Sequence, residues 1–101
     1  IFRDPDLFVV ALGEEAEKES FKLIQQLRKQ EFWVERGYES TSMKSQMRKA
    51  DKSRATFVLI LGENELKSGK CPLKNMKNGE QIDVSLDELV SKAKTFLTFS
   101  D

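Results

Sequence analysis

The sequence has no histidine, one cysteine, two prolines and one tryptophan. Histidine is the side chain that most often acts as a general base or as a metal ligand, so its absence removes the commonest chemistry of both kinds. The lone Cys71 has no second cysteine for a disulfide or a zinc site, and no histidine to activate it. We therefore predict no catalytic residue and no metal site in this chain, and a single free cysteine fits a reducing cytoplasm.

Long apolar runs are also missing, because no stretch of about 18 residues is apolar enough to cross a membrane. The N-terminus, IFRDPDLFVV, has no basic region ahead of an apolar one and does not resemble a signal peptide. With 39% hydrophobic and 34% charged residues, the 101 residues suit one globular domain with a charged surface. We assign residues 1–6 to the remnant of a linker and residues 7–101 to the domain.

A nucleotide-binding phosphate loop is absent as well. Such a loop has four residues between its glycines and a serine or threonine after the lysine. Here six residues separate Gly62 from Gly69, and Cys71 follows Lys70. Gly62 is better explained as a turn between a strand and a helix, and we predict no cofactor in this chain.

Charge is balanced in total but segregated along the chain. Seventeen basic residues match seventeen acidic ones, whereas residues 36–77 hold ten Lys/Arg against four Asp/Glu. That segment carries a net charge of +6, and the remainder carries −6. A neutral protein with this distribution can still present a positive face to a polyanion.

Hydrophobic periodicity and turn residues predict alternating strands and helices. Residues 81–84 form the second strand of a hairpin at Asn78-Gly79, and Ser85 begins the last helix. The predicted strands are residues 7–12, 32–36, 56–61, 70–76 and 81–84. The predicted helices are residues 14–30, a second helix that is capped by Thr41 or Ser42 and runs to residue 52, and residues 63–67 and 85–99. We place Met43, Met47 and Ala50 on the core side of the second helix.

This order predicts an α/β fold with three α/β/α layers and a five-stranded mixed sheet, mostly parallel with one antiparallel strand. Ligands of such sheets bind at the carboxyl ends of the parallel strands. Here these ends lead into Gly13-Glu14, residues 36–42 and residues 62–65. The predicted site is therefore at that edge.

Several polar and aromatic residues near this edge suit RNA. Lys44, Arg48 and Lys52 recur every four residues, so they share one helix face and are candidates for phosphate contacts, or simply a solvated surface. Glu14 and Glu65 follow strands and can accept hydrogen bonds from unpaired bases, although acidic residues at helix starts are also favoured by the helix dipole. Tyr38 follows Gly37 in a loop and is the best candidate for stacking on a base.

Three segments carry a resemblance to a known family. They are DLFVVALGEEAEKESFKLIQQLR, SMKSQMRKADKSRATFVLILGENEL, and the later series SGK, LK, NGEQ and VSLDELV. In order and spacing they resemble the C-terminal anticodon-binding domain of class IIa aminoacyl-tRNA synthetases, most closely that of histidyl-tRNA synthetases, over residues 6–94. The resemblance implies a five-stranded α/β/α domain that recognises a tRNA anticodon stem-loop.

By the same resemblance, residues matching Glu14, Glu65 and Lys74 read anticodon bases. The parent protein would be a homodimeric histidine–tRNA ligase whose separate catalytic domain uses ATP and magnesium, whereas this chain would be no enzyme. Arg54 departs from the family pattern, in which glycine is common at that position. The alternative function is a synthetase-like module for RNA sensing or protein interaction, without aminoacylation.

Overall fold

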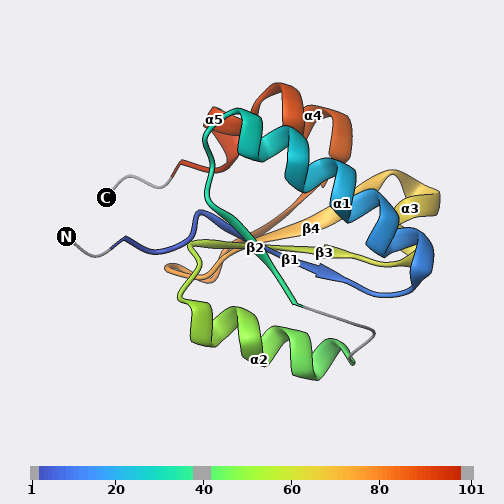
Figure 1. The fold of residues 1–101 in the computed structure, drawn as a ribbon, viewed down its shortest axis with the longest axis horizontal. Helices are drawn as coiled ribbons and strands as arrows, with labels where there is room; N and C mark the ends of the chain where they lie inside the picture. The colour runs from blue at the N-terminus through green and yellow to red at the C-terminus, as the bar shows by residue number, and fades with distance from the viewer. Residues whose placement is uncertain (1–2, 38–41, 99–101) are drawn as a thin grey trace.

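The computed structural model describes residues 3–37 and 42–98, which form a five-stranded sheet with helices on both faces (Figure 1). The strand order is β2-β1-β3-β4-β5. Parallel pairs join β1 to β2 and β1 to β3, while β4 runs antiparallel to β3 and β5. The strands are β1 (Leu7–Ala11), β2 (Val34–Arg36), β3 (Phe57–Leu61), β4 (Lys70–Asn75) and β5 (Gln81–Ser85). The predicted α/β fold, with one antiparallel strand in a mixed sheet, is confirmed.

The helices divide unequally between the two faces of the sheet. Figure 1 shows α1 (Glu14–Lys29), α4 (Leu86–Ser91) and α5 (Ala93–Phe96) on one face and α2 (Met43–Ser53) alone on the other. The short α3 (Glu63–Ser68) follows β3 at the end of the sheet. No helix in the described part of the chain is long and apolar enough to cross a membrane.

The core has two parts because the apolar strands pack on both sides. In β1, Leu7, Val9 and Ala11 belong to the larger cluster with α1 and α4, whereas Phe8 and Val10 belong to the smaller cluster under α2. Side chains alternate between the faces of a strand, so a central strand that is buried on both faces needs a continuous apolar run. This explains the sequence LFVVA in β1.

Local signals in the sequence place the helix starts. The Ser42 hydroxyl accepts a hydrogen bond from the Ser45 backbone N–H at 3.2 Å, and the Ser85 hydroxyl accepts one from Glu88 at 3.1 Å. Each serine thereby satisfies an N–H group that the helix itself cannot pair. Gly13 precedes α1 with a φ of 101°, a conformation that favours glycine. Of the two caps predicted for α2, Ser42 is the one that the structure shows, and Thr41 lies outside the described residues. The predicted start at Ser85 is confirmed.

A buried glutamine joins α2 to the sheet. The ladder between β1 and β2 ends at the pair Val9–Arg36, which leaves the end of β1 without a strand partner on that side. There the Gln46 side chain replaces the strand: its Oε1 accepts a hydrogen bond from the Ala11 N–H at 3.1 Å, and its Nε2 donates one to the Ala11 carbonyl at 2.8 Å. Gln46 is 1% exposed. Gly37 leaves room for it, since a Cβ there would lie 3.4 Å from Gln46 Cγ.

Two details of the predicted packing are wrong. Met43 was expected in the core but is 42% exposed: it is the first residue of α2, and the buried positions of the helix begin one turn later, at Gln46. The second strand begins at Val34 and not at residue 32, because the chain leaves α1 through a turn in which Glu31 has a left-handed φ of 71°. Trp33, just before this strand, is 37% exposed. Its ring lies under the Arg3 guanidinium, 5.8 Å from the ring centroid.

The last helix was expected to be continuous but is broken at Lys92. This residue has a φ of −121° and a ψ of 35°, outside the helical range, so α4 ends at Ser91 and α5 begins at Ala93. The Gln30 side chain donates a hydrogen bond to the Val90 carbonyl at 2.8 Å. This carbonyl would accept a bond from Lys94 in a continuous helix, so its contact with α1 helps to stabilise the break.

Replacing Gln46 with leucine should lower the free energy of unfolding by about 2–4 kcal/mol, because the Ala11 N–H and carbonyl lose their partners in a buried position. Urea denaturation followed by circular dichroism measures the change. Gln25→Leu, at an exposed position of α1, is the matched control and should change stability by less than about 0.5 kcal/mol. Equal midpoints for the two variants would contradict the role given to Gln46.

Candidate nucleic-acid interface

The outer face of α2 presents the predicted line of cations. Lys44, Arg48 and Lys52 are all exposed, on the side of the helix away from the buried Gln46 and Ala50. Within residues 3–37 and 42–98, none of the three forms an ion pair with a carboxylate. We call these three residues the α2 stripe. Three uncompensated charges on one surface suit contact with an anionic polymer.

The strands beside α2 add a partly open sheet face. Since directly opposed residues of an antiparallel pair share a face, Lys74 on β4 lies on the same side as its partner Val58, which packs in the cluster under α2. Pro72 lies two residues before Lys74, so it shares this face, as does Ile60 on β3. Ile60, Pro72 and Lys74 are each half-buried. A flat, partly apolar surface with a cation therefore borders α2.

Glu65 lies at the carboxyl end of the same face. Gly62 is extended and follows Ile60 by two residues, so a side chain there would point to the α2 side. A Cβ built on Gly62 would lie 2.8 Å from Glu65 Oε1, which shows that the carboxylate lies over this glycine. Glu65 and Lys74 therefore share one sheet face. Val58, the partner of Lys74, and Gly62 are separated by four residues, or about 13 Å along β3.

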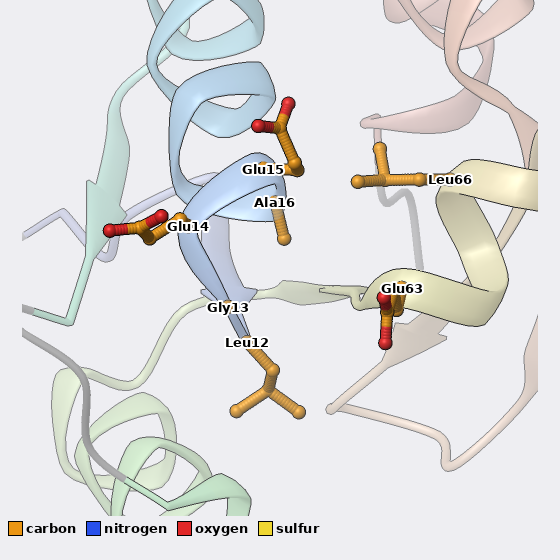
Figure 2. Close-up of a pocket in the computed structure, with 7 residues that line it drawn as sticks. All are labelled: Leu12, Gly13, Glu14, Glu15, Ala16, Glu63 and Leu66. Carbon is orange, nitrogen blue, oxygen red and sulfur yellow. The ribbon is translucent and has the colours of Figure 1, made fainter.

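Glu14 is not brought together with Glu65 and Lys74. In Figure 2 the Glu14 side chain points away from Glu63 of α3, while Leu12 points away from α1. Glu14 lies on α1, which covers the other face of the sheet (Figure 1), and besides its place at the edge of α3 it borders a shallow hollow of about 420 Å³ with Glu17, Lys18, Phe21 and Arg36. The predicted trio of base-reading residues is thus divided between two places. Tyr38, the stacking candidate, falls outside the described residues.

The carboxyl edge between α1 and α3 is acidic. A hollow of about 310 Å³ there is lined by Glu14 and Glu15 from α1 and by Glu63 from α3, with apolar atoms of Leu12 and Leu66 (Figure 2). Clustered carboxylates repel phosphate groups, so this edge is unsuited to an RNA backbone. Ligands of open α/β sheets usually bind at this carboxyl edge. Here the cations of the α2 stripe lie beside the edge, on the α2 side of the sheet.

Two features of this region escaped the sequence analysis. Gln46 interrupts the apolar face of α2, and its position four residues before Ala50 was the signal that it is buried. Phe21 is 59% exposed on α1, and its position outside the helical repeat of Leu23, Ile24 and Leu27 indicated that exposure.

Cys71 lies on β4 but faces the opposite layer, in the larger core cluster. Burial raises the pKa of its thiol from 9.0 to about 11, and the negative charges of Glu65 and Asp83 act in the same direction. A protonated, buried thiol is a poor nucleophile and a poor metal ligand. Among the described residues, no group of three or more His, Cys, Asp or Glu side chains is placed to hold a metal ion.

Comparison with known protein families gives a match to the anticodon binding domain over residues 6–96. The chain is similar to a histidine–tRNA ligase of Acetivibrio thermocellus, with 41% identity over 92 residues that cover 91% of this chain and 22% of that protein. A second histidine–tRNA ligase, from Geobacter metallireducens, is 49% identical over 85 residues, which cover 84% of this chain and 21% of that protein.

Solved structures show the same fold. The apo histidyl-tRNA synthetase of S. aureus superposes with a TM-score of 0.84 and 34% identity, over 94% of this chain and 24% of that one. The chain therefore spans about a fifth to a quarter of the length of the ligases it resembles. The part matched is the anticodon-binding part.

The raised pKa of Cys71 predicts how stability depends on pH. The folded state holds the thiol proton more tightly than the unfolded chain, so the stabilisation is complete below pH 9.0 and is lost as pH rises toward about 11. Urea denaturation over this range should show a steeper loss of stability in the native protein than in Cys71→Ala, which lacks the thiol. Parallel curves for the two proteins would refute the shift.

Proposed function

Because this chain belongs to the anticodon-binding domain family and matches the corresponding part of histidyl-tRNA synthetases, we propose that it binds the anticodon stem-loop of a tRNA on its α2 side. The observation that carries the proposal is the α2 stripe beside the sheet face that holds Lys74 and Glu65. This surface combines free positive charge with a partly apolar floor, and both properties suit an RNA loop.

The α2 stripe would hold the RNA backbone. Lys44, Arg48 and Lys52 lie about 6 Å apart along the helix axis, because each step is four residues of about 1.5 Å. Charges in such a row contact phosphates of any sequence and release counterions, so they supply affinity and not base choice. The balanced net charge of the protein does not oppose this role, since the acidic groups of α1 and α3 lie at another edge.

Base choice would come from the sheet face. A loop lying on Ile60 and Pro72 would bring one unpaired base near Lys74 and another near Glu65. A lysine ammonium donates hydrogen bonds to base acceptors, and a carboxylate accepts them from amino and imino groups. Glu14, at the neighbouring carboxyl edge, and Tyr38, outside the described residues, remain further candidates for base contact.

The parent protein would be a histidine–tRNA ligase in which residues 7–101 form the anticodon-binding domain after a short linker, residues 1–6. Its separate catalytic domain would attach histidine to tRNA using ATP and magnesium, in a cytoplasmic homodimer. By selecting the anticodon, this domain would help that catalytic domain to choose its tRNA.

A second candidate is a module for protein interaction or RNA sensing without aminoacylation. The exposed Phe21, in the shallow hollow that it lines with Glu17, Lys18 and Arg36, favours a protein partner, since exposed aromatic side chains are common in protein interfaces. This surface lies away from the α2 stripe. The two functions are therefore separable by their response to substitutions in α2.

Arg48→Ala should weaken the binding of every anticodon stem-loop alike and reduce the slope of log K against log salt by about one unit, because one phosphate contact is lost. Fluorescence anisotropy with a labelled stem-loop at several salt concentrations measures both effects. Lys94→Ala, an exposed lysine of α5 on the other face, is the control and should leave the slope unchanged. Binding that is insensitive to salt, or equally sensitive in both variants, counts against the α2 side.

Glu65→Gln should act on specificity, because it keeps the size of the side chain but removes the charge of the acceptor. We expect a loss of about 1–3 kcal/mol with the matched anticodon and much less with a base-swapped one. The same anisotropy assay, run with both stem-loops, measures the difference. An equal change with both RNAs would reduce Glu65 to an acidic residue that stabilises the start of α3.

A further inference from the structure

One carboxylate near the N-terminus lies between two cations of the basic segment. Asp4 Oδ1 lies 3.5 Å from Arg54 Nε, and Asp4 Oδ2 lies 3.3 Å from Lys77 Nζ. The two cations therefore hold the two oxygens of the same group. Arg54 follows the C-terminal end of α2, and Lys77 follows β4 at the start of the hairpin turn.

Backbone hydrogen bonds, and not the ion pairs, bring these three residues together. The Pro5 carbonyl accepts a hydrogen bond from the Thr56 N–H at 3.0 Å, and the Thr56 carbonyl accepts one from the Met76 N–H at 2.8 Å. These two bonds hold three segments side by side: the ones that carry Asp4, Arg54 and Lys77. The two cations would stay close to each other if the carboxylate moved away.

The ion pairs themselves are weak. The side chains of Arg54, Lys77 and Asp4 are 75%, 35% and 36% exposed, and exposed ion pairs contribute little to stability. Arg54 also has a φ of 64°, a left-handed conformation in which glycine would be less strained. A guanidinium thus stands at the end of α2, two residues beyond Lys52, and is bound only loosely.

We propose that Arg54 and Lys77 form a phosphate-binding subsite that Asp4 occupies when no RNA is bound, so that the Asp4 carboxylate competes with an RNA phosphate. This inference rests on the proposed function and extends it. A hollow of about 180 Å³ lies beside the pair and is lined by both cations, one carboxylate and three apolar residues: Arg54, Lys77, Asp51, Ala50, Ala55 and Met76. The subsite would prolong the α2 stripe past the helix end toward the β4–β5 hairpin, where a longer stretch of RNA backbone could lie.

Removing the charge of Asp4 tests this competition. Asp4→Asn should raise the affinity for the stem-loop about fivefold at low salt and make the salt slope steeper by about one unit, since one more phosphate is neutralised. Asp87→Asn, an exposed acid of α4 on the other face, makes the same change in net charge and should have an effect of less than about twofold.

A second background shows whether the effect passes through the two cations. In a protein that carries Arg54→Gly and Lys77→Gln, Asp4→Asn should no longer change RNA affinity. Glycine suits the left-handed backbone at this position, so this background should fold, and urea denaturation checks that it does. A gain in affinity that persists without the two cations, or one no larger than that of Asp87→Asn, would overturn the inference.

A probe other than RNA separates this inference from the proposed function. Inorganic pyrophosphate, titrated into Asp4→Asn and followed by NMR, should shift the Arg54 Nε–H and Lys77 side-chain signals, and should shift them less in the native protein. Such shifts without any binding of the stem-loop would support the subsite and refute the proposed function. Stem-loop binding that depends on Arg48, with no pyrophosphate shifts at Arg54 and Lys77, would support the proposed function and refute the subsite.

Discussion

Two hydrogen bonds between the Gln46 side chain and the backbone of Ala11 fix the position of α2. Among the residues described, α2 is the only helix on its face of the sheet (Figure 1). Without a strand partner beyond Arg36, the N–H and carbonyl of Ala11 need another source of hydrogen bonds, and the amide of Gln46 supplies both. This contact sets the rotation of α2 about its axis. Lys44, Arg48 and Lys52 then face solvent, because they lie on the opposite side of the helix.

The unequal helical layers decide which part of the sheet is open. Three helices cover the first face, but α2 packs mainly against β1 and leaves Ile60, Pro72 and Lys74 only half-buried. At the carboxyl edge, Glu14 and Glu15 of α1 and Glu63 of α3 form an acidic hollow. A neutral protein thereby keeps a surface suited to RNA beside one that is not, because the α2 stripe and the carboxylates of the hollow between α1 and α3 lie on different parts of the surface.

Much of the fold was predictable because its signals are local. The serine caps at Ser42 and Ser85, the hairpin at Asn78-Gly79 and the apolar run of β1 each depend on a few neighbouring residues. The errors arose where distant residues compete: Gln46 takes a buried position in α2 that Met43 was expected to share, and Gln30 contacts the Val90 carbonyl beside the break in the last helix. Such contacts join residues up to 60 positions apart, so no local pattern contains them.

The sequence by itself determined the elements, the mixed sheet, the segregation of charge and the family, because periodicity, turn chemistry and motif order are properties of the linear chain. Only the tertiary structure decided which candidate residues meet. It places Lys74 and Glu65 on one sheet face, separates them from Glu14, and brings Asp4 between Arg54 and Lys77. The physical reason is register: the pairing of β3 with β4 and of the N-terminal segment with Thr56 sets these distances, and it depends on hydrogen bonds between segments far apart in the chain.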